Sequence, residues 1–184
     1  MCNDTCSELE GESGLSVYFL ALMFNSTYGA SEALNKVRAA AELGYTWVDD
    51  VAIIERHHSG RIATHTPHGS VKTGAGWGAL LGALVGVFFP PAGFIALTGL
   101  GAGTGALIEK ASKEAYVPED LFDEVKDSLE KGTSALLVLG ETTVMGEVEA
   151  AFAGTYATEI KRELDEDSVE QMKEKVAEAE DEDS

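Results

Sequence analysis

The chain has 184 residues, of which 45% are hydrophobic, so it is long and apolar enough to build one globular domain with a core. Its 32 acidic residues outnumber its 13 basic residues, and the net charge of −19 repels phosphate backbones. The composition therefore excludes wholesale disorder and disfavours a nucleic-acid-binding protein.

The acidic residues are concentrated at the two ends of the chain. Residues 1–14 carry a net charge of −4 and residues 163–184 one of −9, whereas residues 15–162 carry −6. We expect a disordered acidic leader over residues 1–14 and an acidic amphipathic tail over residues 166–184, with Ser168 and Gln171 as a capping box. The tail either keeps the protein soluble or docks a basic protein partner.

The apolar run that follows the leader resembles the core of a signal peptide. A signal peptide has basic residues before its apolar run and a small-residue cleavage site after it, and this sequence has neither. Cys2 and Cys6 are too few for a disulfide-stabilised fold. We therefore expect a cytoplasmic protein that is not secreted, with association to the cytoplasmic membrane as an open alternative.

Residues 15–72 predict a strand, a helix, a second strand and a β-hairpin. The first run is apolar throughout, as in a central strand covered on both faces, whereas the second strand alternates, as an edge strand with one solvent-facing side does. Ser59-Gly60 predicts a two-residue hairpin turn. The expected elements are strands at residues 15–24, 47–56 and 61–65 and a helix at residues 31–43, ended by Gly44.

Residues 111–165 repeat the same plan after an additional helix. Pro118 suits the first turn of that helix, and Gly132 suits its end. A second unbroken apolar run predicts another central strand, and a second alternating run predicts another edge strand. The expected elements are a helix from residue 118, strands at residues 134–139 and 155–164, and a short helix at residues 144–152.

Two strand–helix–strand segments with an insert between them predict an α+β fold. In each segment the first strand is central and the second lies at an edge, which is the pattern of a ferredoxin-like split βαβ sandwich. The expected additions are a glycine-rich helical hairpin over residues 73–110 and an acidic C-terminal helix.

The insert contains 36 consecutive uncharged residues, Thr73–Ile108, of which ten are glycine. Pro90-Pro91 interrupts it, so we predict two helical arms. Several glycines recur every four residues and would therefore form a stripe along each arm that lets a second backbone approach closely. The glycines expected at this helix-packing or oligomer interface are Gly74, Gly78, Gly82, Gly86, Gly99, Gly101, Gly103 and Gly105.

Glycine inside a helix costs about 1 kcal/mol relative to alanine, so ten of them indicate that tight helix packing recovers the loss. Each arm would be about 23–26 Å long, slightly short of the ~30 Å hydrocarbon core of a bilayer. The sequence leaves open whether the hairpin embeds in membrane lipid, forms the core of a homo-oligomer, or packs within its own chain.

Other motifs give weaker signals. Gly101–Ala106 fits the dinucleotide pattern G-x-G-x-x-A, but so does Gly74–Ala79, and neither lies in a convincing βαβ unit. Four histidines, His57, His58, His65 and His68, fall within twelve residues. A regular hairpin cannot gather them around one ion, so only His65 and His68, or pairs between subunits, remain as metal candidates. We expect no cofactor and no catalytic residue.

The insert and the segment after it resemble domain of unknown function family twelve sixty-nine, which is often labelled as a predicted membrane protein family. The similar stretches, within residues 15–165 overall, are residues 78–86, 104–107, 118–140 and 154–158. The resemblance implies a ferredoxin-like body with a glycine-rich helical hairpin, and it brings no established activity.

These observations predict a non-catalytic protein that associates with copies of itself, or with membrane lipid, through residues 73–108. The alternative is a small-ligand or metal-binding α+β module of the dimeric ferredoxin-like type.

Overall fold

The computed structural model describes residues 16–40, 51–65, 81, 85, 119–171 and 174. These residues form an α+β structure, as the sequence predicted. Its elements are β1 (Val17–Phe24), α1 (Gly29–Ala39), β2 (Val51–Arg56), β3 (Ile62–His65), α4 (Glu119–Ser128), β4 (Thr133–Glu141), α5 (Thr142–Phe152) and β5 (Thr158–Leu164).

The five strands form one sheet in the order β3-β2-β4-β1-β5, and every neighbouring pair is antiparallel. β4 lies between β1 and β2, and β1 lies between β4 and β5. Nearly every residue of β1 and β4 is buried, because both of their faces are covered. The prediction that the two unbroken apolar runs are central strands is therefore confirmed.

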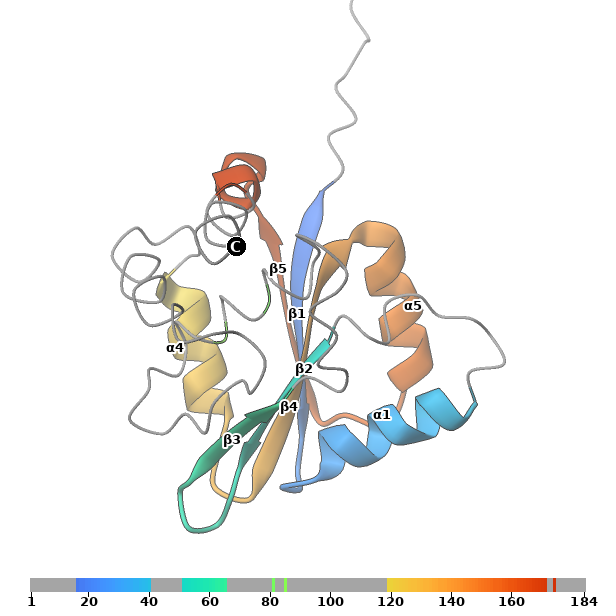
Figure 1. The fold of residues 1–184 in the computed structure, drawn as a ribbon, viewed down its shortest axis with the longest axis vertical. Helices are drawn as coiled ribbons and strands as arrows, with labels where there is room; N and C mark the ends of the chain where they lie inside the picture. The colour runs from blue at the N-terminus through green and yellow to red at the C-terminus, as the bar shows by residue number, and fades with distance from the viewer. Residues whose placement is uncertain are drawn as a thin grey trace, which may run out of the picture.

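Helices α1 and α5 cover one face of the sheet, and α4 lies on the other face (Figure 1). The face under α1 and α5 is packed by leucines of β1 and β4 and by Phe152 at the end of α5. Leu34 of α1 and Val148 of α5 lie on the apolar sides that these helices bury against the sheet.

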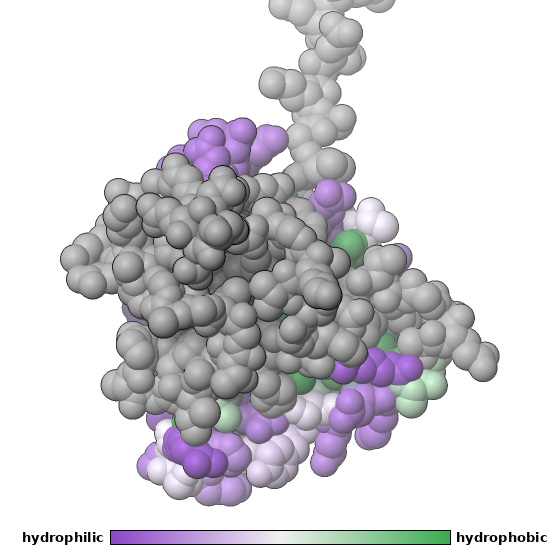
Figure 2. Space-filling view, viewed as in Figure 1, coloured by the Kyte–Doolittle hydropathy of each residue, from purple (hydrophilic) through white to green (hydrophobic). Residues whose placement is uncertain are grey.

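The second face has its own core cluster, which draws on distant parts of the chain. Leu121 and Val125 of α4 pack there together with Leu81, Val85 and Val169. Hydrophilic residues gather instead at the β2–β3 hairpin and at residues 166–171, at opposite ends of the molecule (Figure 2). Both faces of the sheet are thus covered by apolar side chains, and one of the contributing segments is the uncharged glycine-rich run.

The expectation that the second strand is an edge with one solvent-facing side is wrong. β3 pairs with the outer side of β2, so β2 is an interior strand, and its first five residues are all buried. Its two faces contribute to different clusters, with Ile53 under α1 and α5 and Ile54 on the α4 face.

The hairpin between β2 and β3 has a longer loop than predicted. Arg56 pairs with Ile62, and the backbone N–H of His57 donates to the carbonyl of Arg61 at 2.9 Å. The loop therefore has three residues, and its last residue, Gly60, has a φ of 86°. A glycine in this left-handed conformation is typical of three-residue hairpin loops, which shifts the register by one residue from the two-residue turn.

The helix after β5 begins earlier than the expected capping box. The Asp165 carboxylate accepts hydrogen bonds from the backbone N–H and the hydroxyl of Ser168, at 3.1 and 3.0 Å. Asp165 is thus the N-cap, and the prediction of Ser168 in that role is wrong. Val169, one residue further on, is buried in the core cluster of the α4 face.

Candidate functional site

Two residues show where the glycine-rich run meets the body. Leu81 and Val85 are helical, lie four residues apart and therefore share one side of a helix. They are only 0% and 2% exposed, and they belong to the same apolar cluster as Leu121 and Val125 of α4. This side of the run is therefore bound to the sheet of its own chain.

The glycines expected at the interface, Gly74, Gly78, Gly82, Gly86, Gly99, Gly101, Gly103 and Gly105, lie outside the described residues. The rest of the expected hairpin also lies outside them, as do His68 and the leader, residues 1–14. No helix within the described part of the chain is long and apolar enough to span a membrane.

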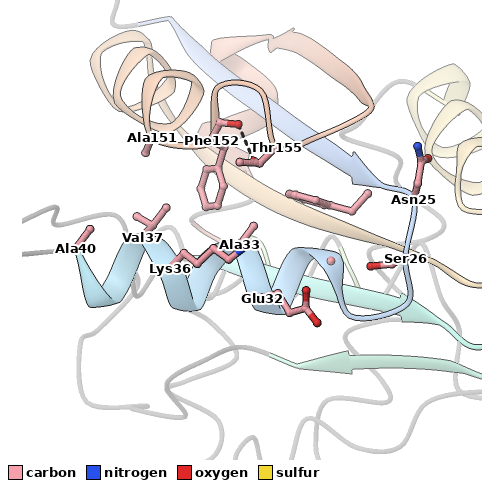
Figure 3. Close-up of a pocket in the computed structure, with 12 residues that line it drawn as sticks. Asn25, Ser26, Glu32, Ala33, Lys36, Val37, Ala40, Ala151, Phe152 and Thr155 are labelled. Carbon is pink, nitrogen blue, oxygen red and sulfur yellow. Dashed lines mark hydrogen bonds between the residues drawn. The ribbon is translucent and has the colours of Figure 1, made fainter.

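A groove of about 460 Å³ lies between α1 and the turn that follows α5 (Figure 3). Phe24 and Phe152 give it apolar walls, and Glu32 and Lys36 stand one helical turn apart along α1. Its lining residues are Phe24, Asn25, Ser26, Gly29, Glu32, Ala33, Lys36, Val37, Ala40, Ala151, Phe152 and Thr155.

The turn beside this groove is fixed by local chemistry. Gly154 has a φ of 73°, and the backbone N–H of Thr155 donates to the Phe152 carbonyl at 3.0 Å, as in a type II turn. The Thr155 hydroxyl donates to the same carbonyl at 2.6 Å. The groove thus combines a carboxylate, an ammonium group and hydroxyl groups with apolar walls.

A buried serine positions the other side of the groove. The Ser134 hydroxyl of β4 donates to the Ser26 carbonyl at 2.7 Å and accepts from the backbone N–H of Ala30 at 3.0 Å. That N–H is in the first turn of α1, where a helix lacks intrahelical acceptors. Ser134 thus caps α1 from the neighbouring strand and fixes the helix on the sheet.

The histidines of the hairpin are separated. The His57 ring packs edge-on against Tyr28, with 5.9 Å between ring centroids, whereas the His58 ring lies over Gly132. His65 sits opposite Ile53 in the β2–β3 pair. In the described ranges, no group of three or more His, Cys, Asp or Glu side chains is placed to hold a metal ion.

Charged side chains of β5 pair with residues on both faces of the sheet. Lys161 Nζ lies 2.6 Å from Glu149 Oε1 of α5 and 5.3 Å from the centroid of the Tyr18 ring. Arg162 pairs with Glu124 of α4. These pairs could not be predicted from the sequence, because the partners are brought together only by the strand order and the placement of the helices.

Tyr156, just before β5, donates a hydrogen bond to Glu159 Oε2 at 2.8 Å. This hydrogen bond, burial and the negative charges of Glu159 and Glu149 raise the pKa of Tyr156 above its ordinary value of 10.0. The bond to the neutral phenol is therefore present at pH values below 10.0 and is lost as the pH rises through the higher folded-state pKa.

We expect a titration of tyrosinate absorbance to show an ionisation of Tyr156 at a pH above 10.0. Glu159→Gln should lower that pKa, because it removes a negative charge next to the phenol, and Tyr156→Phe should abolish that ionisation. An unchanged titration curve in Tyr156→Phe would contradict the assignment.

The described residues define an α+β protein whose antiparallel sheet is covered on both faces, with Leu81 and Val85 of the glycine-rich run packed on one of them. The chain matches the family described as Protein of unknown function (DUF1269) over residues 75–177, more than half of its length. It belongs to this family, which confirms the resemblance to family twelve sixty-nine. No curated protein and no solved structure matches the chain significantly.

The matched range differs from the range of the resemblance. It begins within the uncharged run, includes Leu81 and Val85, and continues through α4, β4, α5 and β5 to residue 177. It does not include β1, α1 or β2. The matched range therefore contains most of the glycine-rich run, helix α4, whose residues pack with Leu81 and Val85, and part of the tail beyond β5.

Proposed function

We propose that this protein associates with copies of itself through the glycine-rich run, and that the run is held on a ferredoxin-like body. The strand order supports the fold assignment. Each strand–helix–strand segment leaves a gap between its two strands, and a central strand of the other segment fills it. That interleaving is the pattern of a split βαβ sandwich, with β3 and α4 as additions.

The burial of Leu81 and Val85 is the observation that carries the proposed association. Both side chains are taken up by the sheet of the same chain, so this side of the run is already occupied. Glycine at every fourth position still has to be explained, because it costs helix stability and leaves little side-chain surface to pack. A second helix backbone at close range is the partner that such a stripe suits.

Helix geometry separates the glycine stripe from the anchored side. Successive residues of an α-helix are about 100° apart around its axis. In a helical first arm, Gly78, Gly82 and Gly86 would share a stripe about a quarter turn from the side that carries Leu81 and Val85. The stripe would then face sideways, parallel to the sheet, where the second arm or another copy can approach.

This placement favours protein assembly over membrane embedding. A helix in lipid presents its large apolar side chains to hydrocarbon, whereas Leu81 and Val85 are buried against the protein's own sheet. We therefore propose a homo-oligomer with protein-covered glycine stripes.

Sizing of the full chain, purified without detergent, tests the proposal. We expect particles of uniform size, larger than the 19.5 kDa monomer. Gly82→Leu and Gly78→Leu should lower the particle mass, because a side chain in the stripe holds the two backbones apart. Leu80→Ile, in the same run, keeps the volume and should leave the mass unchanged.

Thermal unfolding distinguishes a variant that no longer assembles from one whose α+β domain no longer folds. The glycine variants should lose mass while the body stays folded. A monomeric wild-type protein would contradict the proposal, and so would one that is recovered only in detergent. Equal particle mass in the wild type and in both glycine variants would show that the stripe is not the contact.

A further inference from the structure

Among the described strands, β5 has a free outer edge, and its charges are balanced. β5 is the last strand in the sheet order, and none of the other described strands pairs with its second side. It carries Glu159, Lys161, Arg162 and Glu163, so its net charge is zero in a chain with a net charge of −19. An edge that avoided copies of itself by repulsion would carry charges of one sign.

We propose that a second copy of this chain pairs with this edge, β5 against β5, so that two five-stranded sheets become one continuous sheet. Two-fold symmetry makes such a pair antiparallel, with residue i opposite residue j and j opposite i. Directly opposed residues share a face of the sheet, so they must both be even-numbered or both be odd-numbered. This inference deepens the proposed self-association by adding a contact that does not involve the glycine-rich run.

The charges of β5 select one register among those allowed. A register centred on Ile160 places Glu159 opposite Lys161 of the partner subunit, and symmetry repeats this attractive pair. A register centred on Lys161 would instead oppose two lysines at the centre and Glu159 to Glu163 on either side. A register centred on Arg162 would also give two attractive pairs, Lys161 opposite Glu163, but it would oppose two arginines at its centre.

The basic side chain of β5 in this pair is accessible and already held in place. Lys161 is 33% exposed in its side chain, although Glu149 accepts one of its hydrogen bonds at 2.6 Å. Its ammonium group has three N–H donors, so it can bind a second carboxylate from a neighbouring strand. The contacts with Glu149 and the Tyr18 ring restrict its rotamers before association, which reduces the entropy lost on pairing.

Charge reversal tests the pairing. Glu159→Lys and Lys161→Glu each replace two attractive pairs by two repulsive ones, so each should raise the dissociation constant of the β5 contact about tenfold or more. The double variant Glu159→Lys with Lys161→Glu restores opposite charges and should restore the affinity. Sedimentation equilibrium of the full chain at low salt measures all of these dissociation constants. If assembly through the glycine-rich run obscures the β5 contact, the same variants are measured in a chain that also carries Gly82→Leu.

Glu163→Lys is the matched control. It changes the net charge by the same amount on the same strand, but in the Ile160 register Glu163 faces Ala157 of the partner subunit, so the affinity should not fall. Thermal unfolding identifies any variant in which the α+β fold itself, and not only the β5 contact, has been lost. Single reversals that leave the affinity unchanged, or a folded double variant that does not recover it, would overturn the pairing.

The two proposals can fail separately. If Gly82→Leu lowers the particle mass and the β5 reversals change nothing, only the β5 pairing is overturned. If the wild-type chain is monomeric at all concentrations, both proposals are overturned.

Discussion

Truncation of Leu81 to alanine should destabilise the protein by about 2–5 kcal/mol. The Leu81 side chain is fully buried in the cluster that lies between the sheet and α4, so its removal leaves a cavity as well as losing apolar contact. Denaturant unfolding, followed by circular dichroism, measures the change. Among the three locations that the sequence leaves open for the run, this result would support packing of Leu81 within its own chain.

Leu81→Met is the control for this prediction. It keeps the volume and the apolar character of the side chain, so it should cost less than about 1.5 kcal/mol. Equal stability of the wild type and Leu81→Ala would mean that this part of the run does not contribute to the core of the body. In that case Leu81 would not hold the helix on the sheet, and the glycine stripe would not be fixed beside it.

The central strands could be predicted from the sequence because burial of both faces requires a residue pattern that is visible within each strand. A strand covered on both faces needs apolar side chains at every position, and β1 and β4 have them. Their observed bounds lie within two residues of the expected ones. Helix α5 and strand β5 were likewise identified from their periodicity, with the same end points at Phe152 and Leu164.

The position of β2 could not be predicted in the same way. Its alternating pattern resembles that of an edge strand, but β3 covers one edge and Ile54 packs against the α4 face. Glu55 lies on the same face of the strand as Val51 and Ile53, is 6% exposed and accepts a hydrogen bond from the Ser31 hydroxyl of α1 at 2.8 Å. A contact supplied by another element overrides the local pattern here.

The groove and the ion pairs of β5 depend on contacts between residues that are distant in the sequence. Arg162 meets Glu124 across 38 positions, and Ala30 meets Ser134 across 104. No spacing rule connects such residues, because their proximity follows from the strand order. The glycine spacing, in contrast, is visible in the sequence, and its role stays a prediction.

Ser134→Ala should destabilise the protein by about 1–3 kcal/mol, a large effect for the loss of one oxygen atom. The Ser134 side chain is buried, and its hydroxyl serves two backbone groups at the start of α1. Without it, the N–H of Ala30 is left without an acceptor where α1 packs on the sheet. Denaturant unfolding measures the loss, and amide exchange should show faster exchange at Ala30 than in the wild type.

Thr133, the neighbour of Ser134 in β4, provides a matched comparison. Its hydroxyl also donates to a backbone carbonyl, that of Glu130 at 2.7 Å, but this hydrogen bond is exposed to solvent. Water can replace it in Thr133→Val, so that variant should change the stability by no more than about 0.5 kcal/mol. If both variants cost the same, burial of the Ser134 hydroxyl would not be the cause, and α1 would be held on the sheet by its apolar contacts alone.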